Sequence, residues 1–198
     1  MNGKVQREPD TTLYPVPVVL VTCGADGRYN VFSVNRVVSC NAEPPMLGIS
    51  VRPIRASHDL IDGAGEFVVN VPWPDMEVVA DFVGTTTLHK VDKWAVTGLT
   101  ALRAARVSPP LLGECPVNLE CRVVERVRLP SHTFFIGEVV ALHADPAVLN
   151  ERGEVDFARA HGGLPYRAGA VRERPVEKFR PADLRRQVHH WRAGRALE

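Results

Sequence analysis

The most informative part of the chain is residues 30–71, which read NVFSVNRVVSCNAEPPMLGISVRPIRASHDLIDGAGEFVVNV. Its apolar runs, separated by a Glu-Pro-Pro break and by glycines, predict strand, turn, strand, short helix and strand. A polar run, residues 33–36, interrupts the first strand. Further on, Arg52 and Arg55 precede an expected helix N-cap at Ser57. Helix N-termini attract anions and Arg suits the geometry of phosphate, so these features predict a site for a phosphorylated aromatic ligand.

The whole chain has 198 residues, is 45% hydrophobic and carries a formal net charge of +1. This length supports one core. We therefore expect a flexible arm over residues 1–12 and one domain over residues 13–150. Residues 151–198 should form a basic cover and a final helix, from Pro181 to Ala196, packed on the same domain. The basic tail lacks aromatic residues interleaved with its charges, so it does not predict nucleic-acid binding.

The sequence also indicates where the protein resides. No apolar run approaches the ~20 residues of a membrane helix, and the N-terminus has no signal-peptide core. We therefore expect a cytoplasmic protein with no membrane partner. Cys115 and Cys121 have five residues between them, which is not a zinc-ligand spacing. All four cysteines, with Cys23 and Cys40, are expected to be buried, reduced thiols, and no metal site is predicted.

Several short strands connected mainly by tight turns favour a closed antiparallel barrel over a sheet of βαβ units. The glycines of residues 24–27 suit a hairpin turn, and residues 129–131 should join the last two long strands. No Gly-x-Gly-x-x-Gly follows a strand, so a Rossmann domain is not indicated. Short helices are expected to begin at Ser57, at Asp75 and near Val91. The expected strands cover residues 16–23, 29–38, 46–51, 66–71, 116–129 and 133–143.

The fifth of these strands has the clearest period of two in the chain. Apolar residues at 117, 119, 121 and 123 should share one face. The intervening Asn118, Glu120 and Arg122 are expected on the opposite face.

Residues 14–145 resemble the flavin reductase-like, FMN-binding split-barrel family, which includes flavoredoxins and the reductase partners of two-component monooxygenases. The resemblance implies a mainly β fold with peripheral helices, a Greek-key split β-barrel. The matching pieces occur in the order of the family: PVVLVT (17–22), DGRYN (26–30), EPPMLGIS (43–50), RAS (55–57), GEFVVNV (65–71), DKW (92–94), GLT (98–100) and SHTFFIGEV (131–139).

The resemblance implies FMN, with FAD as an alternative flavin, in a groove at the interface of a homodimer. Backbone and small polar side chains from Ser33 to Asn35 would line the ring and the ribityl chain, while Arg55 and Ser57, with Arg52, would hold the phosphate. Lys93 and Trp94 are candidates to close over the flavin from the partner subunit. Tyr166 belongs to a family-like segment near the flavin edge. The predicted cofactor-binding residues are Ser33, Val34, Asn35, Arg36, Ser50, Arg52, Arg55, Ser57, His58, Lys93, Trp94 and Tyr166.

His132 is the predicted catalytic residue. Many family reductases carry Gly-Asp-His followed by a Gly, a segment associated with nicotinamide binding. Here the spacing from His132 to Gly137 is kept, but Pro130-Ser131 replaces Gly-Asp. The resemblance therefore implies NAD(P)H as electron donor, whereas the replaced residues argue for a site that has lost this role.

These observations predict a homodimeric FMN-dependent oxidoreductase of the NAD(P)H:flavin reductase type. Its electrons would pass to a partner flavin-dependent monooxygenase or to a small acceptor. Two alternatives remain open. The protein is either a tailoring enzyme whose retained FMN acts directly on a metabolite, or a non-catalytic split-barrel protein that binds flavin or haem. Interface surface is expected at Trp73, Trp94 and Trp191.

Overall fold

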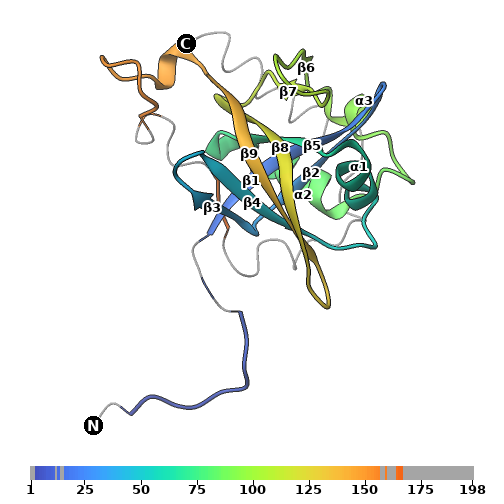
Figure 1. Cartoon of the computed structure of the whole chain (residues 1–198), viewed down its shortest axis with the longest axis vertical. Coiled ribbons are helices and arrows are strands. Elements are labelled where there is room, and N and C mark those ends of the chain that lie inside the picture. The colour runs from blue at the N-terminus through green and yellow to red at the C-terminus, as the bar shows by residue number, and fades with distance from the viewer. Residues whose placement is uncertain (1–2, 12, 14–15, 157–158, 160–163, 167–198) are drawn as a thin grey trace.

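The computed structural model describes residues 3–11, 13, 16–156, 159 and 164–166, and its centre is an eight-stranded sheet in the order β10-β1-β5-β8-β9-β4-β3, with β2 paired to β1 (Figure 1). All of its pairings are antiparallel. The predicted mainly β architecture with peripheral helices is thus confirmed. The strands are β1 (Val16–Ala25), β2 (Arg28–Val34), β3 (Val37–Asn41), β4 (Met46–Val51), β5 (Glu66–Val71), β8 (Val117–Arg128), β9 (Thr133–Ala144) and β10 (Leu164–Tyr166).

The sheet closes on itself because β2 and β3 are two halves of one bent strand. β2 pairs with β1, and after the two residues Asn35 and Arg36 the chain continues as β3, which pairs with β4. At the bend, the Arg36 carbonyl accepts a hydrogen bond from the Ser50 N–H at 3.0 Å. The polar run of the sequence therefore marks the place where the strand changes partners, and backbone there is released from the ladder.

Two predicted hairpins are confirmed. β1 and β2 are joined at Asp26 and Gly27, whose φ angles of 53° and 79° are those of a turn that favours Asp, Asn and Gly. β8 and β9 form the long hairpin expected across residues 129–131. A smaller sheet of β6 (Ala101–Leu102) and β7 (Leu111–Leu112) was not predicted, because two-residue strands leave no periodic signal.

Three α-helices cover the barrel in the part of the chain that the structure describes, and their termini differ in part from the prediction. α1 (Ala56–Ala64) has Arg55, not Ser57, as its N-cap, so the predicted Ser57 cap is wrong. α2 (Glu77–Thr85) follows a 3-10 turn, η1 (Pro74–Met76), and Asp75 lies within that turn. α3 (Lys93–Thr97) begins after Asp92, whose carboxylate accepts the Ala95 N–H at 3.1 Å. A second 3-10 turn, η2 (Pro146–Val148), follows β9.

Two apolar clusters form most of the core. One joins β1 and β2 to α2 and α3, and the other joins β1, β4, β5, β8 and β9 to α1. Trp73 and Trp94 are half-buried and pack against the first cluster, so the core already occupies part of the surface that we had expected them to offer to a partner. Trp191 and the predicted helix from Pro181 to Ala196 lie outside the described residues.

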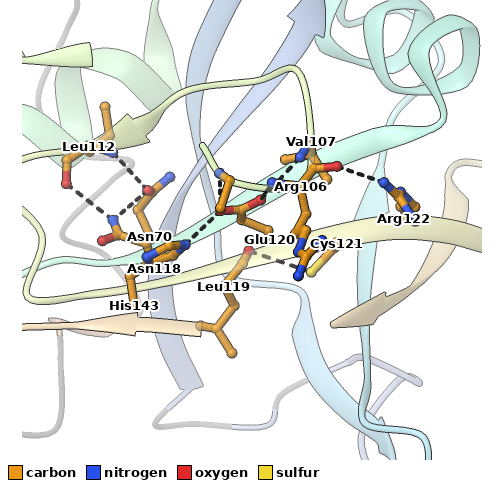
Figure 2. Close-up of polar contacts among 11 residues, drawn as sticks. Asn70, Arg106, Val107, Leu112, Asn118, Leu119, Glu120, Cys121, Arg122 and His143 are labelled. Atoms are coloured by element: carbon orange, nitrogen blue, oxygen red, sulfur yellow. Dashed lines mark hydrogen bonds and ion pairs between the residues drawn. The ribbon is translucent and has the colours of Figure 1, made fainter. Parts of the chain in front are cut away.

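On the second face of β8, Asn118 and Glu120 are buried, whereas Arg122 is exposed. Figure 2 shows the polar contacts of this face. Glu120 is fully buried, and its carboxylate accepts the backbone N–H groups of Ala105, Arg106 and Val107 at 2.8, 2.6 and 3.1 Å. The His143 Nε2 lies 2.6 Å from the same carboxylate. Burial by itself raises the pKa of Glu120, but these hydrogen bonds outweigh it and the pKa is lowered overall. The loop between β6 and β7 covers this face. The sequence pattern of β8 alone does not predict that contact.

Two further expectations concern the burial of the cysteines and the absence of a membrane-spanning helix. Cys23, Cys115 and Cys121 are buried free thiols as predicted, whereas Cys40 is exposed because its edge strand β3 is open to solvent. Within the described part of the chain, no helix combines the length and the apolar character that a membrane span requires.

Candidate functional site

A cleft of about 210 Å³ lies where the bent strand leaves β1, between the ends of β2 and β4 and the starts of α1 and α3. It brings together ten of the predicted residues, which come from four separate segments of the chain. We call it the polar cleft. The predicted residues that line it are Ser33, Val34, Asn35, Arg36, Ser50, Arg52, Arg55, Ser57, Lys93 and His132.

One end of the polar cleft contains Lys93, which is 2% exposed. Its Nζ donates to the carbonyls of Val31 at 2.8 Å and Val83 at 2.7 Å. An ammonium has three N–H donors, so one remains for the cleft. Burial is the main cause that lowers the Lys93 pKa to about 8; Cys23 opposes this shift and the Arg55 guanidinium adds to it. Lys93 therefore lines the cleft of its own chain.

The same end contains two buried polar atoms with no partner among the described residues, Asn30 Oδ1 and Thr86 Oγ1. Asn30 is held in place because its Nδ2 donates to Ser57 Oγ at 2.8 Å. An unpaired buried amide oxygen or hydroxyl costs about 1–3 kcal/mol, so such atoms mark a place for a polar ligand. A carbonyl oxygen needs a donor such as a sugar hydroxyl, and the Thr86 hydroxyl can donate to an anion.

The start of α1 completes this end of the cleft. Arg55 makes no side-chain cap, and the His58 N–H donates to the Arg55 carbonyl at 2.8 Å, so the N–H groups of Ala56 and Ser57 are the ones left for an external acceptor. The exposed Arg55 side chain and the buried Lys93 ammonium both line the cleft here. We call Asn30, Arg55, Ser57, Thr86 and Lys93 the anion end. The combination of two cations, free N–H groups and a spare hydroxyl suits a phosphate monoester.

The opposite end contains His132, half-buried at the start of β9, with Arg36 and Arg52. Burial, followed by the charges of Arg36 and Arg52, lowers the pKa of His132, which keeps its imidazole neutral at pH 7. Ser131 Oγ lies 2.9 Å from the His132 Nδ1. The serine that replaces the Asp of the family motif thus contacts the imidazole of His132, which lines the cleft.

Ser33 connects the cleft to α2. Its hydroxyl donates to the Ala80 carbonyl, so only its oxygen lone pairs remain for a ligand. Gly84 lies against the Ser33 side chain, and a Cβ at Gly84 would stand 3.1 Å from the Cβ of Ser33. The glycine therefore lets α2 pack closely against Ser33. α2 ends at Thr85, two residues beyond the predicted end at Val83.

Two of the predicted residues with described side chains, His58 and Trp94, do not line the polar cleft. His58 turns towards β9, where its Nε2 lies 2.9 Å from Thr133 Oγ1 and its ring lies 5.3 Å from that of Phe135. Trp94 donates from Nε1 to the Tyr29 carbonyl at 3.1 Å and lines a second groove. The backbone of Tyr166, in β10, pairs with that of Val16 in β1, and the Tyr166 side chain lies outside the described part of the chain.

Sequence reasoning missed the contribution of the segment after α2. Thr86, Thr87 and Leu88 all line the polar cleft. The available signal was the run Gly-Thr-Thr-Thr at residues 84–87, which is polar enough to line a site but has no motif of its own. Asn30 was also missed, because an Asn at a hairpin strand usually reads as a turn residue.

Comparisons with known proteins identify the family. The model described as "Flavin reductase like domain" matches residues 11–170, so this chain belongs to the flavin reductase-like family. The flavoredoxin structure from Methanosarcina acetivorans superimposes with a TM-score of 0.75 at 29% identity, covering 86% of this chain and 96% of that one. The likeness confirms the predicted fold class.

Two curated relatives have named activities. The NADH:riboflavin 5'-phosphate oxidoreductase of Streptomyces pristinaespiralis is 31% identical over 134 residues, which cover 67% of this chain and 73% of the relative. The reductase component of the 4-nitrophenol 4-monooxygenase/4-nitrocatechol 2-monooxygenase of Rhodococcus opacus is 28% identical over 127 residues, covering 64% and 65%. At the level of the family, this chain is therefore related to flavin-dependent oxidoreductases.

Proposed function

We propose that this protein is an FMN-dependent oxidoreductase of the NAD(P)H:flavin reductase type. The observation that carries the proposal is the anion end of the polar cleft. Asn30 Oδ1 and Thr86 Oγ1 have no partner among the described residues, and they lie beside Lys93 and Arg55. A ribityl phosphate offers both hydroxyl donors and anionic acceptors, which matches this donor set.

The residues of the cleft have distinct roles in this proposal. Arg55, Lys93, Thr86 and the first N–H groups of α1 hold the phosphate. The backbone released between β2 and β3, near Asn35, supplies hydrogen-bonding groups to the flavin ring. FMN itself supplies the redox chemistry, because its ring accepts a hydride equivalent and passes the electrons on. The protein binds and orients FMN, and it excludes water from the site.

His132 is proposed to position the nicotinamide nucleotide. Its neutral imidazole lies at the far end of the cleft between Arg36 and Arg52, whose charges suit the phosphates of NAD(P)H. Hydride transfer depends on holding the two reacting atoms about 3–3.5 Å apart, so a positioning contact changes the rate.

Stopped-flow reduction of the FMN-loaded protein tests this function directly. We expect rapid bleaching of the flavin with NADH or NADPH, and a rate about ten- to a hundredfold lower in His132→Ala with unchanged FMN affinity. Photoreduction of both proteins serves as the control for flavin competence. Failure to bind FMN would overturn the proposal, and FMN binding with no reduction by either nucleotide would favour the tailoring-enzyme alternative.

We also propose that the protein acts as a homodimer whose partner chain covers the open side of the polar cleft. Ile54 supports this, because its side chain is 82% exposed although it lies between the cleft residues Arg52 and Arg55. An apolar side chain so placed suits an interface. Sedimentation should show a dimer that Ile54→Asp weakens; a monomer that retains tight FMN binding would contradict the proposal.

The electron acceptor proposed is a flavin-dependent monooxygenase, with a small molecule as the alternative. The support is the likeness to the named monooxygenase reductase component of Rhodococcus opacus. Reduced flavin transfer is measured by coupling the protein to a monooxygenase that accepts reduced FMN and by following oxygen consumption with its substrate present.

A further inference from the structure

Lys93 brings a nucleophilic nitrogen to the polar cleft as well as a charge. Its side chain is 2% exposed, and its Nζ donates to the carbonyls of Val31 at 2.8 Å and Val83 at 2.7 Å. A neutral amine has two N–H donors and one lone pair in a tetrahedral arrangement. The two carbonyls use both donors, so the lone pair of the neutral amine is left for the cleft that Lys93 lines.

The surroundings of Lys93 favour this neutral amine. Burial is the main cause that lowers the pKa of Lys93 to about 8; Cys23 opposes the shift and the Arg55 guanidinium adds to it. About a tenth of the molecules therefore carry a neutral Lys93 at pH 7, far more than for a lysine of ordinary pKa. Lysines that form imines with carbonyl compounds are activated in the same way, by desolvation or by a neighbouring cation.

Groups that can hold a phosphate lie at the same end of the cleft. Arg55 and the N–H groups of Ala56 and Ser57, at the start of α1, are available to an anion. A second observation also indicates a ligand here. Asn30 and Thr86 are 2% and 9% exposed, and their atoms Oδ1 and Oγ1 have no partner among the described residues. A small phosphorylated molecule held by these groups therefore lies in the same part of the cleft as the Lys93 nitrogen.

We propose that Lys93 forms a reversible imine with small phosphorylated aldehydes whose phosphate is held at the start of α1. The nitrogen adds to the aldehyde carbon. Loss of one water, which carries the aldehyde oxygen and both amine hydrogens, then leaves the C=N bond, and no oxidant or reductant is consumed. This activity goes beyond the proposed function, because it is covalent and needs no flavin. The aldehyde and FMN should exclude each other, since both place a phosphate at the anion end.

Pyridoxal 5'-phosphate is the probe, because its imine absorbs visible light and borohydride converts the imine into a stable secondary amine. The flavin-free protein is mixed with one equivalent of the probe, reduced, digested and analysed by mass spectrometry. We expect at least tenfold more label on Lys93 than on Lys90, an exposed lysine outside the polar cleft. Pyridoxal, which lacks the phosphate, should bind about ten- to a hundredfold more weakly. Excess inorganic phosphate should suppress the labelling of Lys93.

Three variants locate the reaction. Lys93→Met should abolish the imine absorbance, and circular dichroism shows whether this variant is folded. Lys90→Met is the matched control and should retain the absorbance. Arg55→Ala should bind the probe about tenfold or more weakly while the label stays on Lys93.

Label spread evenly over Lys93 and Lys90 would overturn the inference. So would labelling of Lys93 that pyridoxal matches and inorganic phosphate does not suppress, a result that holds whether or not Lys93→Met folds. FMN binding is measured separately by fluorescence quenching. A protein that binds FMN and forms no imine overturns this inference alone, whereas one that forms the imine and binds no FMN overturns the proposed function alone.

Discussion

The Glu120 cluster and the anion end of the polar cleft are both buried polar regions, but they differ in how their hydrogen bonds are completed. Every oxygen of the Glu120 carboxylate has a partner within the chain, supplied by three backbone N–H groups and His143. At the anion end, Asn30 Oδ1 and Thr86 Oγ1 have none among the described residues, and Lys93 has a donor to spare.

This difference indicates that the Glu120 cluster stabilises the fold and that the anion end binds a ligand. A buried charge with all its partners fixes the loop between β6 and β7 on the sheet and leaves nothing for a ligand. Buried groups left without partners cost stability, and they persist where a bound molecule completes them. Substitutions in the first region should therefore change stability alone, and those in the second should change ligand affinity.

The largest expected effect is on the Glu120 cluster. Glu120→Gln leaves buried donors facing an amide, which should lower the free energy of unfolding by about 3 kcal/mol. Chemical denaturation measures this, and Glu125→Gln, at an exposed site on the same strand, should stay within about 0.5 kcal/mol of the wild type. FMN affinity of the folded Glu120→Gln protein should not change; a tenfold loss would break the distinction between the two regions.

Arg55→Ala should produce the second largest effect, on affinity. Loss of a charge-assisted contact to phosphate costs about 1.5–3 kcal/mol, so FMN affinity should fall about ten- to a hundredfold. Riboflavin, which lacks the phosphate, is the control ligand and its affinity should be nearly unchanged. Equal losses for FMN and riboflavin would remove Arg55 from the phosphate site.

Thr86→Val tests the unpaired hydroxyl with a substitution of the same shape. Removing a buried hydroxyl that has no partner should leave stability unchanged or raise it by about 1 kcal/mol, while FMN affinity falls about three- to tenfold. Thr85→Val is the matched control, because its hydroxyl donates to Asp81 and Phe82 carbonyls within α2. If Thr86→Val lowers stability and leaves FMN affinity unchanged, the Thr86 hydroxyl has a structural role and does not bind the ligand.

The smallest expected effect is the pH dependence that Lys93 confers. Its pKa of about 8 lies below the ordinary value of 10.5, so its ammonium loses its charge as the pH rises through 8. FMN affinity should fall severalfold between about pH 7 and pH 9, and riboflavin affinity should not. Lys93→Met should abolish this slope, and a slope that persists in the variant would assign it to another group.

The same group has the opposite effect on the stability of the flavin-free protein. Between about pH 8 and 10.5 the unfolded chain binds more protons at Lys93 than the folded chain, so the contribution of Lys93 to stability rises with pH. The Glu120 carboxylate behaves as the usual acid case: its pKa is lowered on folding, and the stability it contributes is lost as the pH falls through the folded value.

The sequence by itself determined the local elements and the residue types of the site. Local sequence predicts the elements through the hairpin glycines, the apolar runs and the break at Glu43-Pro44. The order of the family segments supports the assignment of the polar run and of Arg55 to the site. These features depend on short-range geometry, so the pattern shows them directly.

Only the tertiary structure decided which groups meet. Thr86, Lys93 and Asn30 reach one cleft because the bent strand closes the barrel beside α2 and α3, and no periodicity records that contact. Glu120 and Lys93 look like solvent-facing charges in sequence, but each is buried by a segment distant along the chain. Burial and hydrogen-bond partners depend on contacts between distant parts of the chain. They give the Glu120 carboxylate a structural role and leave the Lys93 ammonium with a donor for a ligand in the cleft.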